Sequence, residues 1–242
     1  MSVSEWSTGK QYFPYVDGMR AISIFFVIAY HAWLPVFKSG SIGVDVFFII
    51  SGFLITSLLL KELGSTGTIS LKKFYVRRVF RIFPGLVTLL LVGTILQRYW
   101  RQDFLGPDAA RSLLAGWGMF IDLFSMGHHS ANAFNHLWSV HLEEQFYLFW
   151  SILLVCMLRL KRLRGVILES FLLIVVLGCF VLRLGLIGVV AIGHSPIVGT
   201  LQFLVGDRVD HLFLGCLFGY LVAAPTLTPS FAPISHAFAK AV

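Results

Sequence analysis

Charged residues are scarce in this sequence. Only 13% of its 242 residues are Asp, Glu, Lys or Arg, whereas 57% are hydrophobic. A soluble domain carries about 25% charged residues, which cover its aqueous surface. Together with a mean hydropathy of +0.82, this composition argues against an ordinary soluble protein and predicts a chain whose main solvent is lipid.

Cysteine pairs and several common catalytic signatures are absent as well. The three cysteines, Cys156, Cys179 and Cys216, all lie inside apolar runs, which favours small buried residues over a disulfide framework. The histidines are accompanied by neither an H-E-x-x-H pattern nor a cysteine pair, so we predict no metal site and no bound cofactor. The sequence also lacks a G-x-S-x-G elbow, a P-loop and a dinucleotide fingerprint.

Positive charge is present in short clusters between apolar runs, although the formal net charge is +7. This pattern is typical of cytoplasmic loops under the positive-inside rule and not of a nucleic-acid surface. We therefore predict a multi-pass protein of the cell (plasma) membrane with both termini in the cytoplasm. The clusters are Lys72, Lys73, Arg77, Arg78 and Arg81, and then Arg159, Lys161, Arg162 and Arg164.

The apolar runs predict an all-α fold, a polytopic transmembrane helix bundle of about six spans with about 20 residues each. The first run follows a polar segment and has no small-residue cleavage site after it, so we interpret it as a retained span. The predicted spans are Met19–Phe37, Ile42–Leu60, Pro84–Trp100, Trp138–Leu158, Val166–Val190 and Arg208–Ala224.

Three further segments complete the predicted organisation. Arg111–Phe124 is short and contains Arg111 and Asp122, which favours an interfacial or re-entrant piece. Ser70–Phe83 is interpreted as a basic helix on the inner face of the membrane, with Leu71, Phe74, Val79 and Ile82 toward lipid. Residues 1–224 then form one transmembrane domain, and residues 225–242 form a Pro- and Ala-rich tail that we expect to be loosely ordered.

Arg20 and His31 are ionisable residues within the first predicted span. Eleven residues at about 100° each bring both to one helix face, about 16 Å apart along the axis. Ionisable groups in a span are costly and usually face a cavity or a partner. The alternative is structural: Arg20 snorkels to the interface and His31 bonds a neighbouring carbonyl.

Asp45 opens the second predicted span and could serve as a helix cap or as a functional group. Gly43 and Gly52 flank it and would allow close packing of helices. Arg208 and Asp210 open the last predicted span, where Arg208 could pair with Asp210 or with another carboxylate.

The segment His136–Tyr147 is the most informative part of the sequence. Glu143 and Glu144 are adjacent carboxylates at the entrance of an apolar helix. Glu143 and Tyr147 are four residues apart and His141 and Glu144 are three apart, which predicts two polar faces. A solvated helix start is the alternative. In the predicted topology the outer half of the membrane contains several of these groups, which favours one shared cavity: His31, Asp45, Glu143, Arg208 and Asp210.

These motifs together resemble the acyltransferase-3 family of membrane acyltransferases, which O-acylate surface and secreted carbohydrates. Tyr15–Arg20 with His31 is similar to the family's R-x10-H span, and Arg77–Pro84 resembles its R-x-x-R-I-x-P element. The other three matching segments are Gly43–Thr56, Leu137–Tyr147 and Arg208–Asp210. All five occur in the family's order, and they extend from Tyr15 to about Tyr220. The family's domain has roughly ten spans of about 20 residues, so the resemblance implies that this chain is a C-terminally truncated part of such a domain.

The resemblance implies O-acetylation of a carbohydrate, with an acyl-CoA such as acetyl-CoA as the donor and a sugar hydroxyl as the acceptor. His31 is then the predicted general base, since its unperturbed pKa of about 6.5 suits proton removal near neutral pH. Glu143 would orient it or balance its charge, and Arg20 would complete the catalytic set. Arg77, Arg78 and Arg81 would bind CoA phosphates, because guanidinium groups pair bidentately with phosphate. The predicted substrate-binding set also includes Asp45, Glu144, Arg208 and Asp210.

Two alternatives to an active enzyme stay open. One is an inactive fragment or a non-catalytic subunit of a carbohydrate-export assembly. The other is a transporter whose intramembrane ionisable groups line a substrate path. The expected partners are membrane lipid, the acyl donor and the carbohydrate, with no nucleic acid; self-association into a homo-oligomer is left open.

Overall fold

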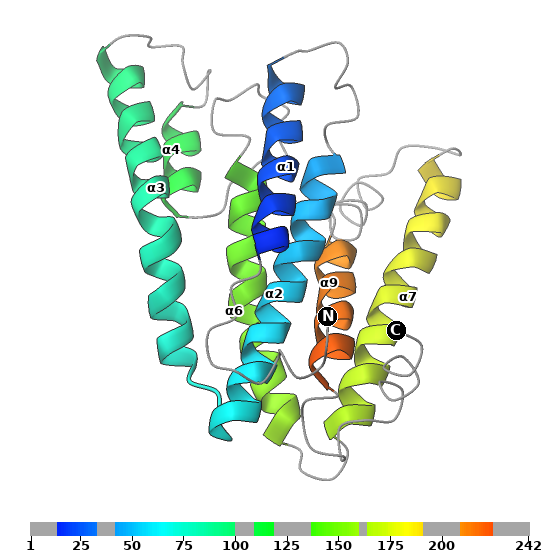
Figure 1. The fold of residues 1–242 in the computed structure, drawn as a ribbon. Helices are drawn as coiled ribbons and strands as arrows, with labels where there is room; N and C mark the ends of the chain where they lie inside the picture. The colour runs from blue at the N-terminus through cyan, green and yellow to red at the C-terminus, as the bar shows by residue number, and fades with distance from the viewer. Residues whose placement is uncertain are drawn as a thin grey trace. The chain divides into compact units, whose positions relative to one another are not determined.

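The structure is a computed structural model that describes residues 14–32, 42–99, 109–118, 137–159, 164–190 and 209–224. Every regular element in these ranges is an α-helix (Figure 1), which confirms the all-α prediction. The helices are α1 (Pro14–His31), α2 (Ile42–Thr66), α3 (Leu71–Tyr99), α4 (Ala109–Trp117), α6 (Trp138–Arg159), α7 (Arg164–Val190) and α9 (Val209–Ala223).

The chain divides into two units. The first contains Met1–Ile69 and Trp150–Val242, and the second contains Ser70–Phe149. Helix α6 contributes its first half to the second unit and its last half to the first. Each unit has its own internal contacts and is described by itself.

Two of the described helices, α2 with 25 residues and α3 with 29, are long and apolar enough to cross a membrane by length and composition. Helix α4 has nine residues, which at about 1.5 Å per residue cannot cross a hydrocarbon core of about 30 Å. That length agrees with an interfacial or re-entrant piece, although the end of the predicted segment lies outside the described residues. The count of about six spans and the assignment of the two membrane sides stay predictions.

Within the first unit, α2 packs against α1 on one side and α9 on the other, and α9 also packs against α7 (Figure 1). Helices α2 and α9 run in the same direction, and α1 and α7 run opposite to them. These directions are those expected for the first, second, fifth and sixth predicted spans.

Glycines allow α2 and α9 to pack with their backbones in contact. A Cβ added to Gly52 would overlap the carbonyl oxygen of Leu212, and one added to Gly215 would overlap the carbonyl oxygen of Ile49. Gly219 lies one turn further along α9 and completes a G-x-x-x-G pattern. Helices in lipid associate by van der Waals packing, and small residues permit the close approach that this packing needs. We call this contact the glycine seam, defined by Gly52, Gly215 and Gly219.

Aromatic side chains continue the core of the first unit beside the glycine seam. The Trp150 indole Nε1 donates a hydrogen bond of 2.9 Å to Thr56 Oγ1, which satisfies a buried donor. The Trp150 ring lies 6.5 Å from that of Phe171 and 5.8 Å from that of Phe213, measured between centroids. This cluster joins α2, α6, α7 and α9.

The second unit corrects the prediction of a separate interfacial helix before Pro84. Helix α3 continues through Pro84 without interruption from Leu71 to Tyr99. Proline removes one backbone N–H donor from the helix. In an apolar environment the remaining backbone groups have no water to bond to, so the helical hydrogen bonds on both sides of a proline are kept. The Thr88 hydroxyl donates a 2.7 Å hydrogen bond to the Pro84 carbonyl oxygen one turn earlier, so this polar side chain is satisfied within the helix.

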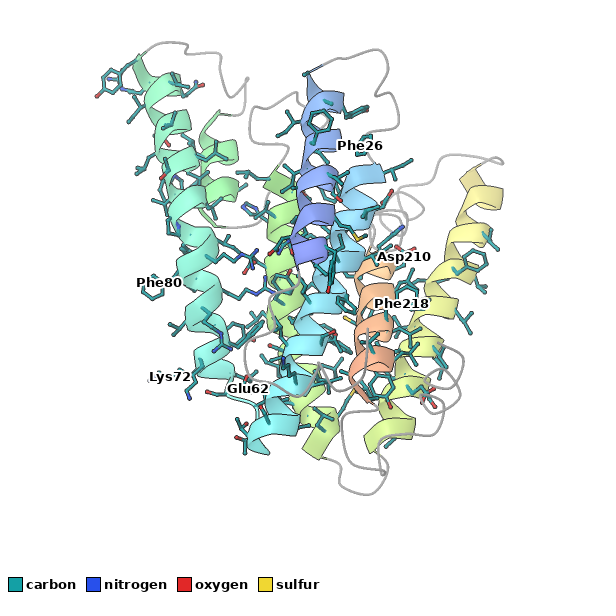
Figure 2. The ribbon with its side chains drawn as sticks, viewed as in Figure 1. Phe26, Glu62, Lys72, Phe80, Asp210 and Phe218 are labelled. Atoms are coloured by element: carbon teal, nitrogen blue, oxygen red, sulfur yellow. The ribbon has the colours of Figure 1, made fainter. Side chains whose placement is uncertain are left out.

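The predicted lipid-facing side of residues 70–83 is also partly wrong. Phe74 is buried, with 3% of its surface exposed, because its ring packs beside Arg78. Val79 is exposed as predicted. Phe80, which was not in the predicted set, is exposed as well, and Figure 2 shows its side chain pointing away from α3. The apolar positions of this segment therefore serve both lipid contact and packing within the unit.

Candidate active site

A buried polar cluster joins α3 to the first half of α6 in the second unit. Its members are Arg78 from α3 and His141, Glu143, Glu144 and Tyr147 from α6. The exposed fractions are 8% for Arg78, 4% for Glu143, 1% for Tyr147 and 0% for His141. Burying so many ionisable groups is costly unless they are paired, which marks the cluster as a candidate functional site. We call it the α3–α6 cluster.

Arg78 and Tyr147 are the centre of the α3–α6 cluster. The guanidinium carbon of Arg78 lies 3.9 Å from the centre of the Tyr147 ring and 5.5 Å from that of Phe74, both within cation–π range. The Tyr147 hydroxyl donates a hydrogen bond to Glu143 Oε1. The four-residue spacing of Glu143 and Tyr147 thus gives the shared helix face that the sequence predicted.

Glu144 differs from Glu143 in how its carboxylate is held. Its Oε1 atom is fully buried and accepts no hydrogen bond from any described residue. It lies close enough to Glu143 and Arg78 to be coupled to both charges. An unsatisfied buried acceptor costs about 1–3 kcal/mol, so its presence requires an explanation, and a role in catalysis or binding is one.

The three arginines predicted to bind CoA phosphates do not act as one group. Arg78 is buried in the α3–α6 cluster, whereas Arg77 and Arg81 are exposed on α3. The exposed pair, four residues apart on one helix face, lies outside the contact between α3 and α6.

The first unit brings together a second polar group at the starts of α2 and α9. His211 Nδ1 lies 2.9 Å from Asp210 Oδ1, and His211 Nε2 lies 3.8 Å from Asp45 Oδ1. All three side chains are partly exposed, and Figure 2 shows Asp210 near the beginning of α9. Asp45 and Asp210 were predicted from sequence. His211 was missed, although its position directly after the R-x-D motif was a usable signal.

Arg20 on α1 lies over the Phe47 ring of α2, with 4.9 Å between its guanidinium carbon and the ring centre. Its Nη1 atom is buried without a hydrogen-bond partner among the described residues. His31 is the last residue of α1, and its side chain lies outside the described residues, as does Arg208. The prediction that one outer cavity gathers His31, Asp45, Glu143, Arg208 and Asp210 therefore stays a prediction.

Within the described ranges, no three His, Cys, Asp or Glu side chains come together as ligands for a metal ion. The candidate chemistry rests on carboxylates, arginines and histidines inside an apolar helical protein. Such groups are typical of helical membrane proteins that bind or transform a polar substrate.

Comparison with known proteins identifies the family. The sequence model described as an acyltransferase domain matches residues 13–241, so the chain belongs to the acyltransferase-3 family. The resemblance inferred from the five sequence motifs is thereby confirmed. No solved structure matches the chain.

Several bacterial proteins are similar in sequence. A protein of Staphylococcus aureus (strain COL), provisionally named an O-acetyltransferase, is 40% identical over 154 residues, 61% of this chain and 26% of the relative. The peptidoglycan O-acetyltransferase OatA of Listeria monocytogenes is 30% identical over 235 residues, 91% of this chain and 36% of the relative. The O-acetyltransferase OatA of Staphylococcus aureus (strain NCTC 8325) is 30% identical over 229 residues, 87% of this chain and 35% of the relative. The chain thus spans about a third or less of the length of these relatives.

Proposed function

We propose that this chain is the membrane part of an O-acetyltransferase that transfers an acetyl group from acetyl-CoA to a hydroxyl of a cell-surface carbohydrate. The observation that supports this proposal most strongly is the α3–α6 cluster. Leucine side chains would pack between apolar helices better than buried Arg, Glu and Tyr side chains do, so the polar residues indicate a function other than packing. The names of two relatives, one of which acts on peptidoglycan, support the same acceptor class.

The proposed donor site uses the exposed arginines of α3. Arg77 and Arg81 are exposed on the same helix, and guanidinium groups form bidentate hydrogen bonds with phosphate oxygens. The predicted cytoplasmic location of this basic segment matches the compartment in which acetyl-CoA is available. Loss of Arg81 should therefore raise the KM for acetyl-CoA more than the KM for the carbohydrate.

The proposed acceptor site uses the polar groups of the predicted outer half. Asp45, Asp210, Arg208 and Glu144 would hydrogen-bond sugar hydroxyls. His31 is the proposed general base, with Glu143 balancing its charge and Arg20 on the same helix face. In the step itself, the sugar oxygen attacks the thioester carbonyl as His31 takes the hydroxyl proton. The new C–O ester bond forms, the C–S bond breaks, and the imidazolium returns its proton to the CoA thiolate.

The experiment uses the full-length protein in lipid vesicles with labelled acetyl-CoA and a soluble peptidoglycan glycan as the acceptor. Wild-type protein should transfer the label to the glycan as a base-labile ester. His31→Gln and His31→Ala should insert normally and transfer about 10²–10⁴ times more slowly, the usual effect of removing a general base.

Two results would count against this proposal. Transfer by a stably inserted His31→Ala protein at the wild-type rate would eliminate His31 as the base. An absence of transfer by well-folded wild-type protein, with several carbohydrate acceptors, would favour the non-catalytic subunit instead.

A further inference from the structure

Arg78 is the one arginine of the basic segment whose surroundings are unsuited to a soluble ligand. It is 8% exposed, and its guanidinium group lies over the ring of Tyr147 and beside that of Phe74. Arg77 and Arg81, one residue before it and three after it, are exposed. With so little of its surface exposed, Arg78 is not accessible to a donor phosphate from outside the contact between α3 and α6.

The positive charge of Arg78 lies near the negative charges of two glutamates on α6. Glu143 and Glu144 are adjacent, and Glu143 is 4% exposed. Two adjacent carboxylates with little access to water repel each other and lose hydration, and a nearby cation partly offsets both costs. The positive charge of Arg78 acts on Glu144. The Arg78 guanidinium also lies over the ring of Tyr147, whose hydroxyl donates a hydrogen bond to Glu143.

The two glutamates are held differently by this arrangement. Glu143 accepts a hydrogen bond from the Tyr147 hydroxyl, whereas Glu144 Oε1 accepts no hydrogen bond from a described residue. Glu144 Oε1 is therefore the acceptor atom that the α3–α6 cluster leaves for a donor from elsewhere. A sugar hydroxyl, the acceptor of the proposed reaction, is such a donor.

We propose that Arg78 is a positioning residue for the acceptor carboxylate Glu144 and not a ligand for the donor phosphates. Arg78 fixes Tyr147 by stacking, Tyr147 fixes Glu143 by its hydrogen bond, and the charge of Arg78 holds Glu144 in place. Glu144 Oε1 then accepts a hydrogen bond from the carbohydrate. The inference rests on the proposed acetyl transfer for its substrate, but the contacts that support it lie entirely within the second unit.

Kinetics of the full-length protein separate the two roles of arginine. Arg78→Met should lower kcat by about 10²-fold, as expected when a reacting group is misplaced by about 1 Å, and should raise the KM for the glycan while the KM for acetyl-CoA stays unchanged. Arg78→Lys keeps the charge but loses the planar stack, so its defect should be of the same kind and smaller. Arg81→Met should show the opposite split, with a raised KM for acetyl-CoA.

The matched control removes a positive charge from the same helix at an exposed position. Lys73 is exposed near the start of α3, and Lys73→Met should leave both KM values unchanged. If Arg78→Met raises the KM for acetyl-CoA as much as Arg81→Met does and keeps its kcat, Arg78 is a donor ligand and the proposal is wrong.

A second measurement does not depend on catalysis. Arg78→Met should lower the melting temperature, because it removes the positive charge that offsets the negative charge of Glu144 in a poorly hydrated place. Adding Glu144→Gln should recover part of that loss, and Lys73→Met with Glu144→Gln should show no such recovery. Additive losses from Arg78→Met and Glu144→Gln would overturn the pairing, even in a protein that transfers no acetyl group. Conversely, recovery without any transfer by wild-type protein would support the pairing and reject the proposed function.

Should Arg78→Met fail to fold, Arg78→Lys and Tyr147→Phe carry the same test. Tyr147→Phe keeps the ring beneath Arg78 and removes only the hydroxyl that holds Glu143. It should reduce kcat less than Arg78→Lys and leave calorimetric binding of coenzyme A unchanged. Weakened coenzyme A binding by Arg78→Lys, to the extent seen for Arg81→Met, would again reject the proposal.

Discussion

The glycine seam of the first unit and the α3–α6 cluster of the second solve the problem of helix contact in different ways. At the seam, Gly52 and Gly215 let α2 and α9 approach until the backbone of one helix meets that of the other. In the α3–α6 cluster, a buried arginine, a tyrosine and two glutamates occupy the contact between two apolar helices. The glycine seam is made of residues that have no side-chain functional group. The α3–α6 cluster is made almost entirely of residues whose side chains carry one.

The difference indicates where function is located. Small residues at a helix contact maximise van der Waals packing, which is the main attraction between helices in lipid. Buried ionisable groups add little net stability, because the loss of hydration offsets most of their attraction. Several buried ionisable groups in one helix contact therefore lower the quality of packing there, as is common at functional sites.

The largest expected effect on stability comes from filling the glycine seam. Gly215→Ala places a methyl group against the Ile49 carbonyl in a contact that only backbone movement can relieve. We expect a loss of about 3 kcal/mol in the free energy of unfolding, the upper part of the usual range for overpacking. Thermal or chemical unfolding in detergent measures it.

The control for this prediction is Gly178→Ala on α7, where no heavy atom lies within 4 Å of the added Cβ. It should be neutral or stabilising by up to about 1 kcal/mol, because alanine is the better helix former. Equal effects of the two substitutions would show that α2 and α9 are not in backbone contact.

A smaller effect is expected where α2 and α9 begin. His211 lies between Asp210 and Asp45, but its Nε2 is 3.8 Å from Asp45 Oδ1 and the side chains are partly exposed. Solvent screens such a pair, so a double-mutant cycle of His211→Gln and Asp45→Asn should give a coupling of about 0.5 kcal/mol. A coupling several times larger would mean that this contact, and not the glycine seam, determines how α9 packs on α2.

The sequence predicted the features that depend on local pattern. Apolar runs and their flanking polar residues placed α6 and α7 within two residues of their observed bounds. Gly43 and Gly52 were expected to allow close packing, and an added Cβ at either one would meet the backbone of a neighbouring helix. The spacing of Glu143 and Tyr147 correctly indicated a shared face.

Features that depend on the environment of a residue were missed. Pro84 is a helix breaker in water, but lipid gives the backbone no alternative partner, so α3 continues through it. Arg78 looks like its neighbours in a basic run, and only the fold shows that it faces Tyr147 while Arg77 and Arg81 are exposed. His211 joins residues far apart in the chain, so its contact with Asp45 could not be derived from spacing along one helix.

The most direct test of this account compares Glu144→Gln with Gly215→Ala in one assay of acetyl transfer per folded molecule, with the melting temperature measured on the same samples. The account predicts that Glu144→Gln keeps or raises the melting temperature and loses most of its transfer rate. Gly215→Ala should lose melting temperature and keep its rate per folded molecule. If both variants lose stability and transfer in the same proportion, the α3–α6 cluster is a packing contact like the glycine seam, and the assignment of chemistry to it is wrong.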